Sequence, residues 1–195
     1  MLTPEKQYIA VIDTETNWYD QVMSIGVVLA EADTLRLAAA KYYVLEPEAA
    51  VGGMYTGAMG IQNPEKINHC TREAAMGDLC RWLRASGVEQ MFAYNAVFDR
   101  THLPELAWLA WYDILRVAAY RQTNWAIPAG AECCRTGRLK RNYGVEAILR
   151  LLSGDGAYCE THNALYDARD ELKIMQLLGL GLDRYRCALL PAPKE

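Results

Sequence analysis

Three short apolar segments near the start of the chain constrain its fold more than any other feature. The first, residues 7–13, reads Gln-Tyr-Ile-Ala-Val-Ile-Asp, a run that suits a strand buried on both faces and ending at a carboxylate. Residues 23–30 and 37–45 have the same character and are separated by short polar breaks. We therefore expect the fold to open with three antiparallel strands.

Helical patterns follow, with one more strand between them. A fourth strand is expected over 89–94, and helices are expected over 71–86, 96–110, 113–121, 143–152 and 163–178. Pro104 should kink or break the second of these helices, and Asp113 is placed to cap the third. Strands followed by alternating helices and a strand describe a single α/β domain over residues 1–195.

Residues 46–68 connect the third strand to the first helix. They contain four glycines and two prolines, so we expect a long surface loop with at most a helical turn. The segment lacks the Lys and Ser/Thr ending of a phosphate-binding P-loop, and its glycines are therefore expected to serve turns. Loops of this length often cover a site.

Composition excludes several classes of protein. Hydrophobic residues make up 52% and charged residues 23%, which is typical of globular domains and unlike disordered or fibrous chains. The longest apolar runs are far short of the roughly 18 residues that a membrane span needs. The N-terminal residues lack the basic and then apolar layout of a signal peptide. We therefore expect a cytoplasmic protein with no membrane partner.

The net charge bears on nucleic-acid binding, and the cysteine content bears on disulfides and metal binding. The formal net charge is −4, so the chain as a whole does not attract polyanions, and any contact with nucleic acid must be local. The six cysteines form no CxxC pair, and reduced thiols are the favoured reading. A zinc site built from Cys133, Cys134, Cys159 and His162 is the weaker alternative, because adjacent cysteines rarely point at one tetrahedral ion.

Acidic residues gather at three points that the predicted fold can bring together. Asp13 and Glu15 are two residues apart, so in an extended chain both side chains leave the same face. Asp99 follows the fourth predicted strand, and Asp167 lies early in the last predicted helix. Two carboxylates aimed together repel each other unless a cation sits between them. Asp13 and Glu15 alone are weak evidence for a functional site. Asp99 and Asp167, in two other segments, strengthen that evidence.

Four carboxylates from three segments suit two divalent cations. Mg²⁺ and Mn²⁺ take oxygen ligands and leave coordination sites for water and phosphate. Two such ions about 3.5 to 4 Å apart can activate an attacking water and stabilise the leaving 3′ oxygen of a phosphodiester. His162 supplies the proton acceptor for that water, since histidine is largely neutral near about pH 7.

The order and spacing of these residues resemble a known family, the DEDDh 3′-to-5′ exonucleases. That superfamily includes the proofreading subunit of bacterial replicative DNA polymerase, RNase T and oligoribonuclease. The resemblance extends over residues 8–178, nearly the whole chain. Its three motifs are Asp13-x-Glu15-Thr16, Asn95-x-x-Phe98-Asp99 and His162-x-Ala164-x-x-Asp167.

The resemblance implies a fold, an activity and a set of residue roles. It implies an RNase H-like α/β fold with a mixed five-stranded sheet flanked by helices, and hydrolysis of DNA or RNA from the 3′ end. By this resemblance the metal carboxylates are Asp13, Glu15, Asp99 and Asp167, and the general base is His162. Thr16 matches the family position near the terminal nucleotide, and we also expect Asn95 to contact substrate.

The sequence departs from the family after the first motif. Many members continue with Thr-Gly, whereas Asn17-Trp18-Tyr19 follows here, so the pocket for the terminal nucleotide should differ in shape. Trp18 is a candidate for stacking on a base, a contact worth about 1 to 3 kcal/mol in single-strand binders. The sequence is equally consistent with a structural role, in which Trp18 packs under a loop.

A basic stretch precedes the third motif. Four cations fall within seven residues, and no acid lies between Cys133 and Val145. The stretch either contacts the nucleic-acid backbone or forms an ordinary solvated loop. Its members are Arg135, Arg138, Lys140 and Arg141.

Two other functions remain alternatives to an exonuclease. An RNase H-like endonuclease would also use clustered carboxylates, but the histidine five positions before Asp167 argues against it. A catalytically silent module that binds nucleic acid or protein would be expected to have lost one of the five side chains, and none is lost. The sequence leaves open the choice between DNA, RNA and short oligonucleotides, and between a free-standing protein, a homodimer and a subunit of a larger complex.

Overall fold

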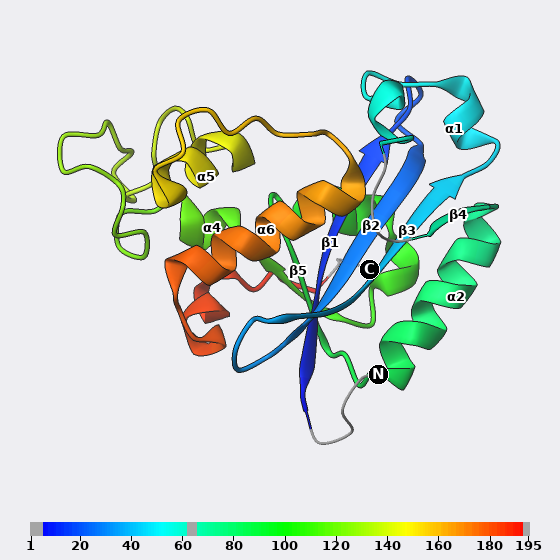
Figure 1. The fold of residues 1–195 in the computed structure, drawn as a ribbon. Coiled ribbons are helices and arrows are strands. Elements are labelled where there is room, and N and C mark those ends of the chain that lie inside the picture. Colours follow the sequence, from blue (N-terminus) through cyan, green and yellow to red (C-terminus); the bar gives the residue numbers. More distant parts are fainter. Residues whose placement is uncertain (1–5, 62–65, 193–195) are drawn as a thin grey trace.

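The computed structural model describes residues 6–61 and 66–192, which build a six-stranded mixed sheet (Figure 1). The strand order is β4-β3-β2-β1-β5-β6. The strands are β1 (Tyr8–Thr16), β2 (Val22–Glu31), β3 (Leu37–Leu45), β4 (Ile67–Cys70), β5 (Gln90–Ala93) and β6 (Ala110–Asp113). The first three form the expected antiparallel meander, and β4, β5 and β6 pair in parallel with β3, β1 and β5. The predicted α/β class is confirmed, with six strands rather than five.

β1 is longer than the sequence pattern indicated. It continues through Thr16 rather than ending at Asp13, because its pairing with β2 continues to the Thr16–Val22 pair. The register shifts between Glu15 and Thr16, where the strand leaves its regular ladder. Asp13 and Glu15 therefore lie within a paired strand, and their side chains are fixed by its pleat.

Helices cover both faces of the sheet. They are α1 (Glu48–Val51), α2 (Arg72–Ala85), α3 (Val97–His102), α4 (Leu115–Ala118), α5 (Val145–Ser153) and α6 (Ala164–Leu178), with the 3-10 helices η1 (Thr56–Ala58), η2 (Pro104–Leu106) and η3 (Leu182–Ala188). In Figure 1 α6 crosses β1 and β2 on one face, with α4 and α5 beside it, and α2 lies on the other face. Among the described residues, no helix is long and apolar enough to cross a membrane.

The sequence pattern failed for two short edge strands. β4 starts inside the segment expected to be a loop, and β6 stands where the end of the helix over 96–110 was expected. Each has only four residues, too few to show a period. β4 takes its extended form from pairing with β3, and β6 from pairing with β5 and, at Tyr112, with Leu189. Pro104 breaks the expected helix into α3 and η2, as predicted. The helix expected over 113–121 is reduced to α4, and the Asp113 side chain accepts from the Leu115 N–H at its start.

The segment after β3 folds back over the end of β1. Its described part contains α1 and η1, so it has two short helical segments rather than the single turn expected. The Trp18 N–H donates to the Gly52 carbonyl at 3.1 Å. A Cβ on Gly53 would lie 2.6 Å from the Thr16 carbonyl oxygen, so the two backbones touch. We call residues 46–61 the covering loop.

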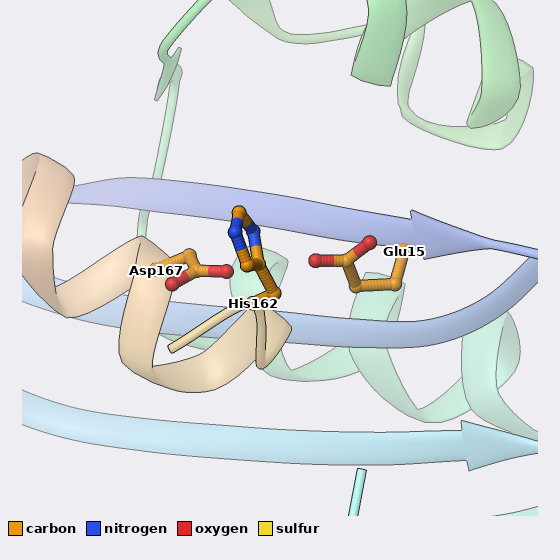
Figure 2. A group of neighbouring side chains, drawn as sticks. All are labelled: Glu15, His162 and Asp167. Carbon is orange, nitrogen blue, oxygen red and sulfur yellow. The ribbon is translucent and has the colours of Figure 1, made fainter. Parts of the chain in front are cut away.

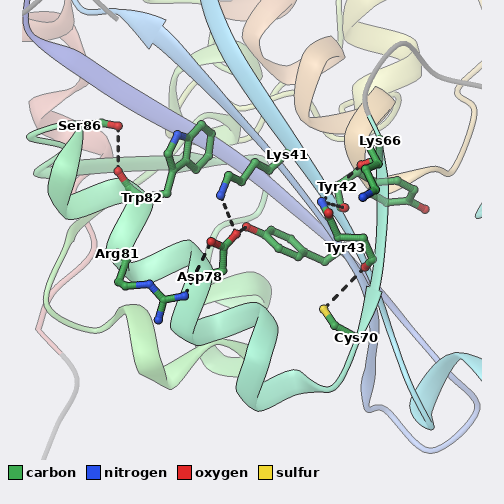
Figure 3. Close-up of polar contacts among 10 residues, drawn as sticks. Lys41, Tyr42, Tyr43, Lys66, Cys70, Asp78, Arg81, Trp82 and Ser86 are labelled. Atoms are coloured by element: carbon green, nitrogen blue, oxygen red, sulfur yellow. Dashed lines mark hydrogen bonds and ion pairs between the residues drawn. The ribbon is translucent and has the colours of Figure 1, made fainter. Parts of the chain in front are cut away.

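A polar cluster fixes α2 to the outer half of the sheet (Figure 3). The Asp78 carboxylate accepts from Lys41 Nζ at 2.6 Å and from the Tyr43 hydroxyl at 2.8 Å. Both partners lie on β3, and Arg81 of α2 lies 3.9 Å from the same carboxylate. This attachment leaves the opposite face of the sheet free for α6.

Gly26 allows α6 to approach the sheet closely. On β2 it pairs with Asp13, and a Cβ at Gly26 would lie 2.2 Å from the backbone of Ala164 and Leu165. Backbone atoms cannot move aside as a flexible side chain can. The first turn of α6 is therefore held against the strand beside Asp13 only because residue 26 has no side chain.

We predict that Gly26→Ala lowers the free energy of unfolding by about 3 kcal/mol or more, the upper range for overpacked cores, because the added methyl group meets backbone on α6. Urea denaturation followed by circular dichroism measures this. Gly77→Ala is the matched control. A Cβ at Gly77, inside α2, would meet only the end of the Arg81 side chain at 3.5 Å, an ordinary contact, so this substitution should stabilise the protein by roughly 0.5–1 kcal/mol. Equal effects of the two substitutions would contradict the close approach.

Candidate active site

β1 presents two carboxylates to the face that α6 covers. Ile9 and Val11 pack into the core on the α6 side, and Asp13 and Glu15 continue the same alternation. The expectation that both side chains leave one face is thus met. Their partners on β2 are Gly26 and Ser24, so no large side chain separates this pair from the start of α6.

The start of α6 is fixed by Asn163. This buried side chain caps the helix: its oxygen accepts from the backbone N–H groups of Leu165 and Tyr166 at 3.2 and 3.4 Å. Its amide nitrogen donates to the Tyr42 hydroxyl at 3.1 Å and to the Ala58 carbonyl at 2.8 Å. One residue thus joins α6, β3 and the covering loop.

Glu15, His162 and Asp167 meet at this point. Each offers one ligand atom, and the three atoms all lie within 4.8 Å of one another. Figure 2 shows the two carboxylates facing each other with the imidazole beside the gap. Asp167 is only 3% exposed and lies in the first turn of α6, where the helix dipole favours negative charge.

Asp99 reaches the same region from α3. It is 2% exposed, and its Oδ1 accepts from the Thr14 hydroxyl at 2.8 Å. Of the neighbouring charges that raise the pKa of Asp13, that of Asp99 has the largest effect. Asp13 and Asp99 thus lie near enough for their charges to interact, whereas only Glu15, Asp167 and His162 come within ligand distance of one another.

Burial raises the pKa values of all four carboxyls, and the charges of neighbouring acids raise those of Asp13, Glu15 and Asp167 further. Burial, then the charge of Asp99, raises the pKa of Asp13 well above its ordinary value. Burial raises the pKa of Asp99 to about 7. Burial, then the charge of Glu160, raises the pKa values of Glu15 and Asp167 to about 8. Neighbouring carboxyls with such pKa values are a recognised sign of a functional site.

The donor set fits hard divalent cations. Asp13 Oδ2 and Asp167 Oδ1 are buried and have no hydrogen-bond partner. A buried carboxylate oxygen without a partner is costly, and a cation offers such oxygens a partner that the protein does not. Carboxylate oxygens are the ligands that Mg²⁺ and Mn²⁺ prefer.

His162 is held by an aromatic ring that the sequence did not indicate. Tyr55 of the covering loop stacks on the imidazole, with ring centroids 4.0 Å apart and planes inclined by 14°. His162 also has a φ of 54°, in the left-handed region. Tyr55 sits among glycines in a segment without periodicity, so no sequence pattern pointed to it.

The residues expected to bind substrate beside the first two motifs have varied surroundings. Thr16 is half-buried at the end of β1. Trp18 is 65% exposed, so the alternative in which it packs under a loop is wrong. Asn17 explains the local departure from the family: its side chain accepts from the Tyr19 and Gln21 N–H groups and forms the turn. Asn95 is exposed with a φ of 62°, and its N–H donates to Asp113.

The basic stretch is not brought to the carboxylates. Figure 1 places the loop over 121–143 beyond α5, away from the end of β1 and the start of α6. Arg138 lies over the Tyr143 ring at 5.0 Å, and Arg141 Nη2 is 3.0 Å from the Glu132 carboxylate. Lys140 is exposed. A role of Arg138, Lys140 and Arg141 in binding nucleic acid stays a prediction.

The cysteines take no part in the cluster. Within residues 6–61 and 66–192, no cysteine belongs to a group of side chains placed to hold a metal ion. The structure thus gives no support to the zinc site built on Cys133, Cys134 and Cys159.

Comparison with known proteins shows the fold. No family model and no curated protein matches the sequence. Among solved structures, the nuclease domain of 3′hExo, a DEDDh family member bound to rAMP, matches at a TM-score of 0.62 and 14% identity, covering 98% of this chain and 99% of that one. Exonuclease X in complex with 5′ overhanging duplex DNA matches at 0.55 and 19%, covering 92% and 98%. A 3′-exonuclease in specific recognition of a histone mRNA stem-loop matches at 0.62 and 12%, covering 96% and 86%.

These likenesses extend over nearly the whole of each chain. The protein therefore has the fold of the DEDDh 3′-exonucleases, the nuclease fold that the three motifs implied.

We predict that the metal-free protein loses stability as the pH rises. Unfolded carboxyls have pKa values of about 4, whereas Asp99 titrates at about 7 and Glu15 and Asp167 at about 8 in the folded protein. Between these values the folded state holds more protons than the unfolded state, so the free energy of unfolding falls with rising pH. Urea denaturation in EDTA from about pH 5 to about pH 9 measures the decline.

Two substitutions and the addition of Mg²⁺ test whether these carboxyls cause the loss of stability at high pH. Asp167→Asn should flatten it, whereas Asp33→Asn, an exposed acid in the β2–β3 turn, should leave it unchanged. Saturating Mg²⁺ should restore stability at high pH, because the ion binds only the folded carboxylates. Stability that stays level over this range without metal would show that these groups ionise freely.

Proposed function

We propose that this protein is a metal-dependent 3′-to-5′ exonuclease that hydrolyses phosphodiester bonds in DNA or RNA with Mg²⁺ or Mn²⁺. The observation that carries the proposal is the meeting of Glu15, His162 and Asp167, with Asp13 and Asp99 beside them, on a 3′-exonuclease fold. These are the five side chains that the motifs assigned to catalysis. The nucleic acids bound to the solved structures of the same fold give further support.

The four carboxylates would hold the cations. When bound, two divalent cations supply positive charge for the attacking and leaving oxygens of the phosphodiester. Asp13 is central to this arrangement. Its side chain points from β1 toward α6, and the charges of Asp99, Asp167 and Glu15 all raise its pKa. Thr14 and the α6 helix cap keep Asp99 and Asp167 in place before any ion binds.

His162 would accept the proton of the attacking water. It is half-buried and within reach of the two carboxylates that face each other across the gap. The Tyr55 ring stacked on it limits rotation of the imidazole, so that the proton acceptor is held in place before substrate arrives.

The turn between β1 and β2 offers a surface for the bases. Trp18 is 65% and Tyr19 75% exposed, and both follow the strand that carries the carboxylates. Asp20 Oδ1 of this turn is 3.1 Å from His102 Nε2 of α3, which ties the turn to the segment that carries Asp99. Stacking on aromatic side chains tolerates any base sequence, because every base has a π-face.

Hydrolysis of 5′-labelled single-stranded DNA and RNA with Mg²⁺ or Mn²⁺, with products resolved by length, tests the proposal. We expect a ladder that shortens from the 3′ end and disappears in EDTA. Asp13→Asn and Asp167→Asn should nearly abolish it, because each removes a cation ligand while keeping the side-chain shape. Asp33→Asn is the matched control and should cut like the wild type.

Other outcomes would replace the proposal. Products of internal cleavage would indicate an RNase H-like endonuclease. Folded protein that binds single strands without cutting single-stranded, duplex or very short substrates would indicate a silent binding module.

His162→Ala is expected to lower kcat by about 10² to 10⁴-fold with little change in KM, because the general base acts only in the chemical step. Steady-state kinetics on a short oligonucleotide measure both constants. His69→Ala is the control, since His69 is exposed on β4 and lies near Glu46. An unchanged kcat in His162→Ala would assign the base to another group.

A further inference from the structure

Glu171 is a buried carboxyl that the three motifs do not include. It lies one helical turn after Asp167 on α6, so both side chains leave the same face of the helix. Its neighbours on that face, Ala168 and Leu172, are buried apolar residues, and Glu171 itself is 1% exposed. Acidic residues are almost never fully buried without a partner, so this position requires an explanation.

The surroundings of Glu171 connect it to the other acids. The backbone N–H of Tyr94, at the end of β5, donates to its carboxylate. Among the charges that raise the pKa of Asp13, Glu171 comes second after Asp99 and ahead of Asp167 and Glu15. Glu171 is therefore near enough to Asp13 and Asp99 for their charges to interact, and it faces the same way from α6 as Asp167.

Three buried carboxyl oxygens between α6 and the sheet have no hydrogen-bond partner. They are Asp13 Oδ2, Asp167 Oδ1 and Glu171 Oε2. Hydrogen bonding between two such acids would satisfy one pair, but the geometry shows none among these three atoms. Cations bound among these carboxyls would offset the cost of leaving the three oxygens without partners.

We propose that Glu171 is a fifth carboxylate of the cation site, and that it supports cation binding on the side of Asp13 and Asp99. The inference rests on the proposed function, because it assumes that the cluster holds divalent cations. It differs from a purely structural role, in which Glu171 would only link α6 to Tyr94.

Titration of the metal-free protein with Mn²⁺ alone, followed by calorimetry, tests the inference without substrate or activity. Glu171→Gln keeps the size of the side chain and removes its charge. We expect it to weaken Mn²⁺ binding by about tenfold or more, the range found for groups that support metal ligands. Glu171→Met, which is also similar in size, should do the same and provides a second variant if one of the two folds poorly.

Asp170→Asn is the matched control. Asp170 is the preceding residue on α6, but its carboxylate accepts from the Tyr158 hydroxyl. Its charge acts on Asp167, behind those of Glu160 and Glu15, and is not among those that act on Asp13. Its effect on the Mn²⁺ dissociation constant should stay within about threefold, well below the effect expected of a supporting ligand.

Melting temperatures with and without Mn²⁺ distinguish a role of Glu171 in cation binding from a purely structural one. Without metal, Glu171→Gln should melt at the same temperature as the wild type or higher, because one of several repelling acids is gone. The rise in melting temperature on adding Mn²⁺ should shrink. A structural Glu171 would give the reverse: a lower melting temperature without metal and an unchanged rise.

The possible failures are distinguishable. If the wild type binds Mn²⁺, Asp13→Asn abolishes binding and both Glu171 variants bind like the wild type, then only the role of Glu171 is overturned. If the wild type binds no Mn²⁺, or Asp13→Asn leaves binding unchanged, the metal centre itself is overturned, and with it the role of Glu171.

Discussion

The backbone of α6 lies against β2 at Gly26, and the arrangement of the site depends on this approach. Helices usually pack on sheets through side chains, which would hold the first turn of α6 farther from β1. Here the missing side chain lets Ala164 and Leu165 touch the strand directly beside Asp13. Asn163 then fixes the helix start to β3 and the covering loop. The positions of Asp167, His162 and Glu171 follow from that placement.

A site assembled in this way is unstable by itself. Five acids are gathered where water is scarce, and burial is the first cause of each raised pKa. The apolar packing of α6 against β1 and β2 must offset that repulsion in the metal-free protein. The same repulsion would give the proposed cation site its affinity, since a bound cation is stabilised by the charges that destabilise the empty cluster. Stability and cation binding are thus opposed at these residues, as is common at functional sites.

Much of this arrangement could be predicted from sequence, for identifiable physical reasons. The meander and α6 have long, regular apolar patterns, and the spacing of Asp13 and Glu15 fixed a common face. The strands β4 and β6 were not predicted, because a segment of four residues is too short to show a hydrophobic period. Tyr55 reaches His162 through tertiary packing of an irregular loop, which no local pattern encodes. Glu171 did leave a signal: it occupies a core position in the stripe that contains Ala168, Leu172 and Met175. An acid in such a stripe is a reason to look for a partner.

The site combines the first strand with the last long helix, and this has a consequence during synthesis. The meander can form as soon as residues 8–45 have emerged, since its contacts are local. The acid cluster remains incomplete until α6 has left the ribosome and docked on Gly26. A nascent chain therefore carries Asp13 and Glu15 without their partners until residues 164–178 have been made. If the protein is the exonuclease proposed above, late completion keeps the growing polypeptide inert beside the messenger that encodes it.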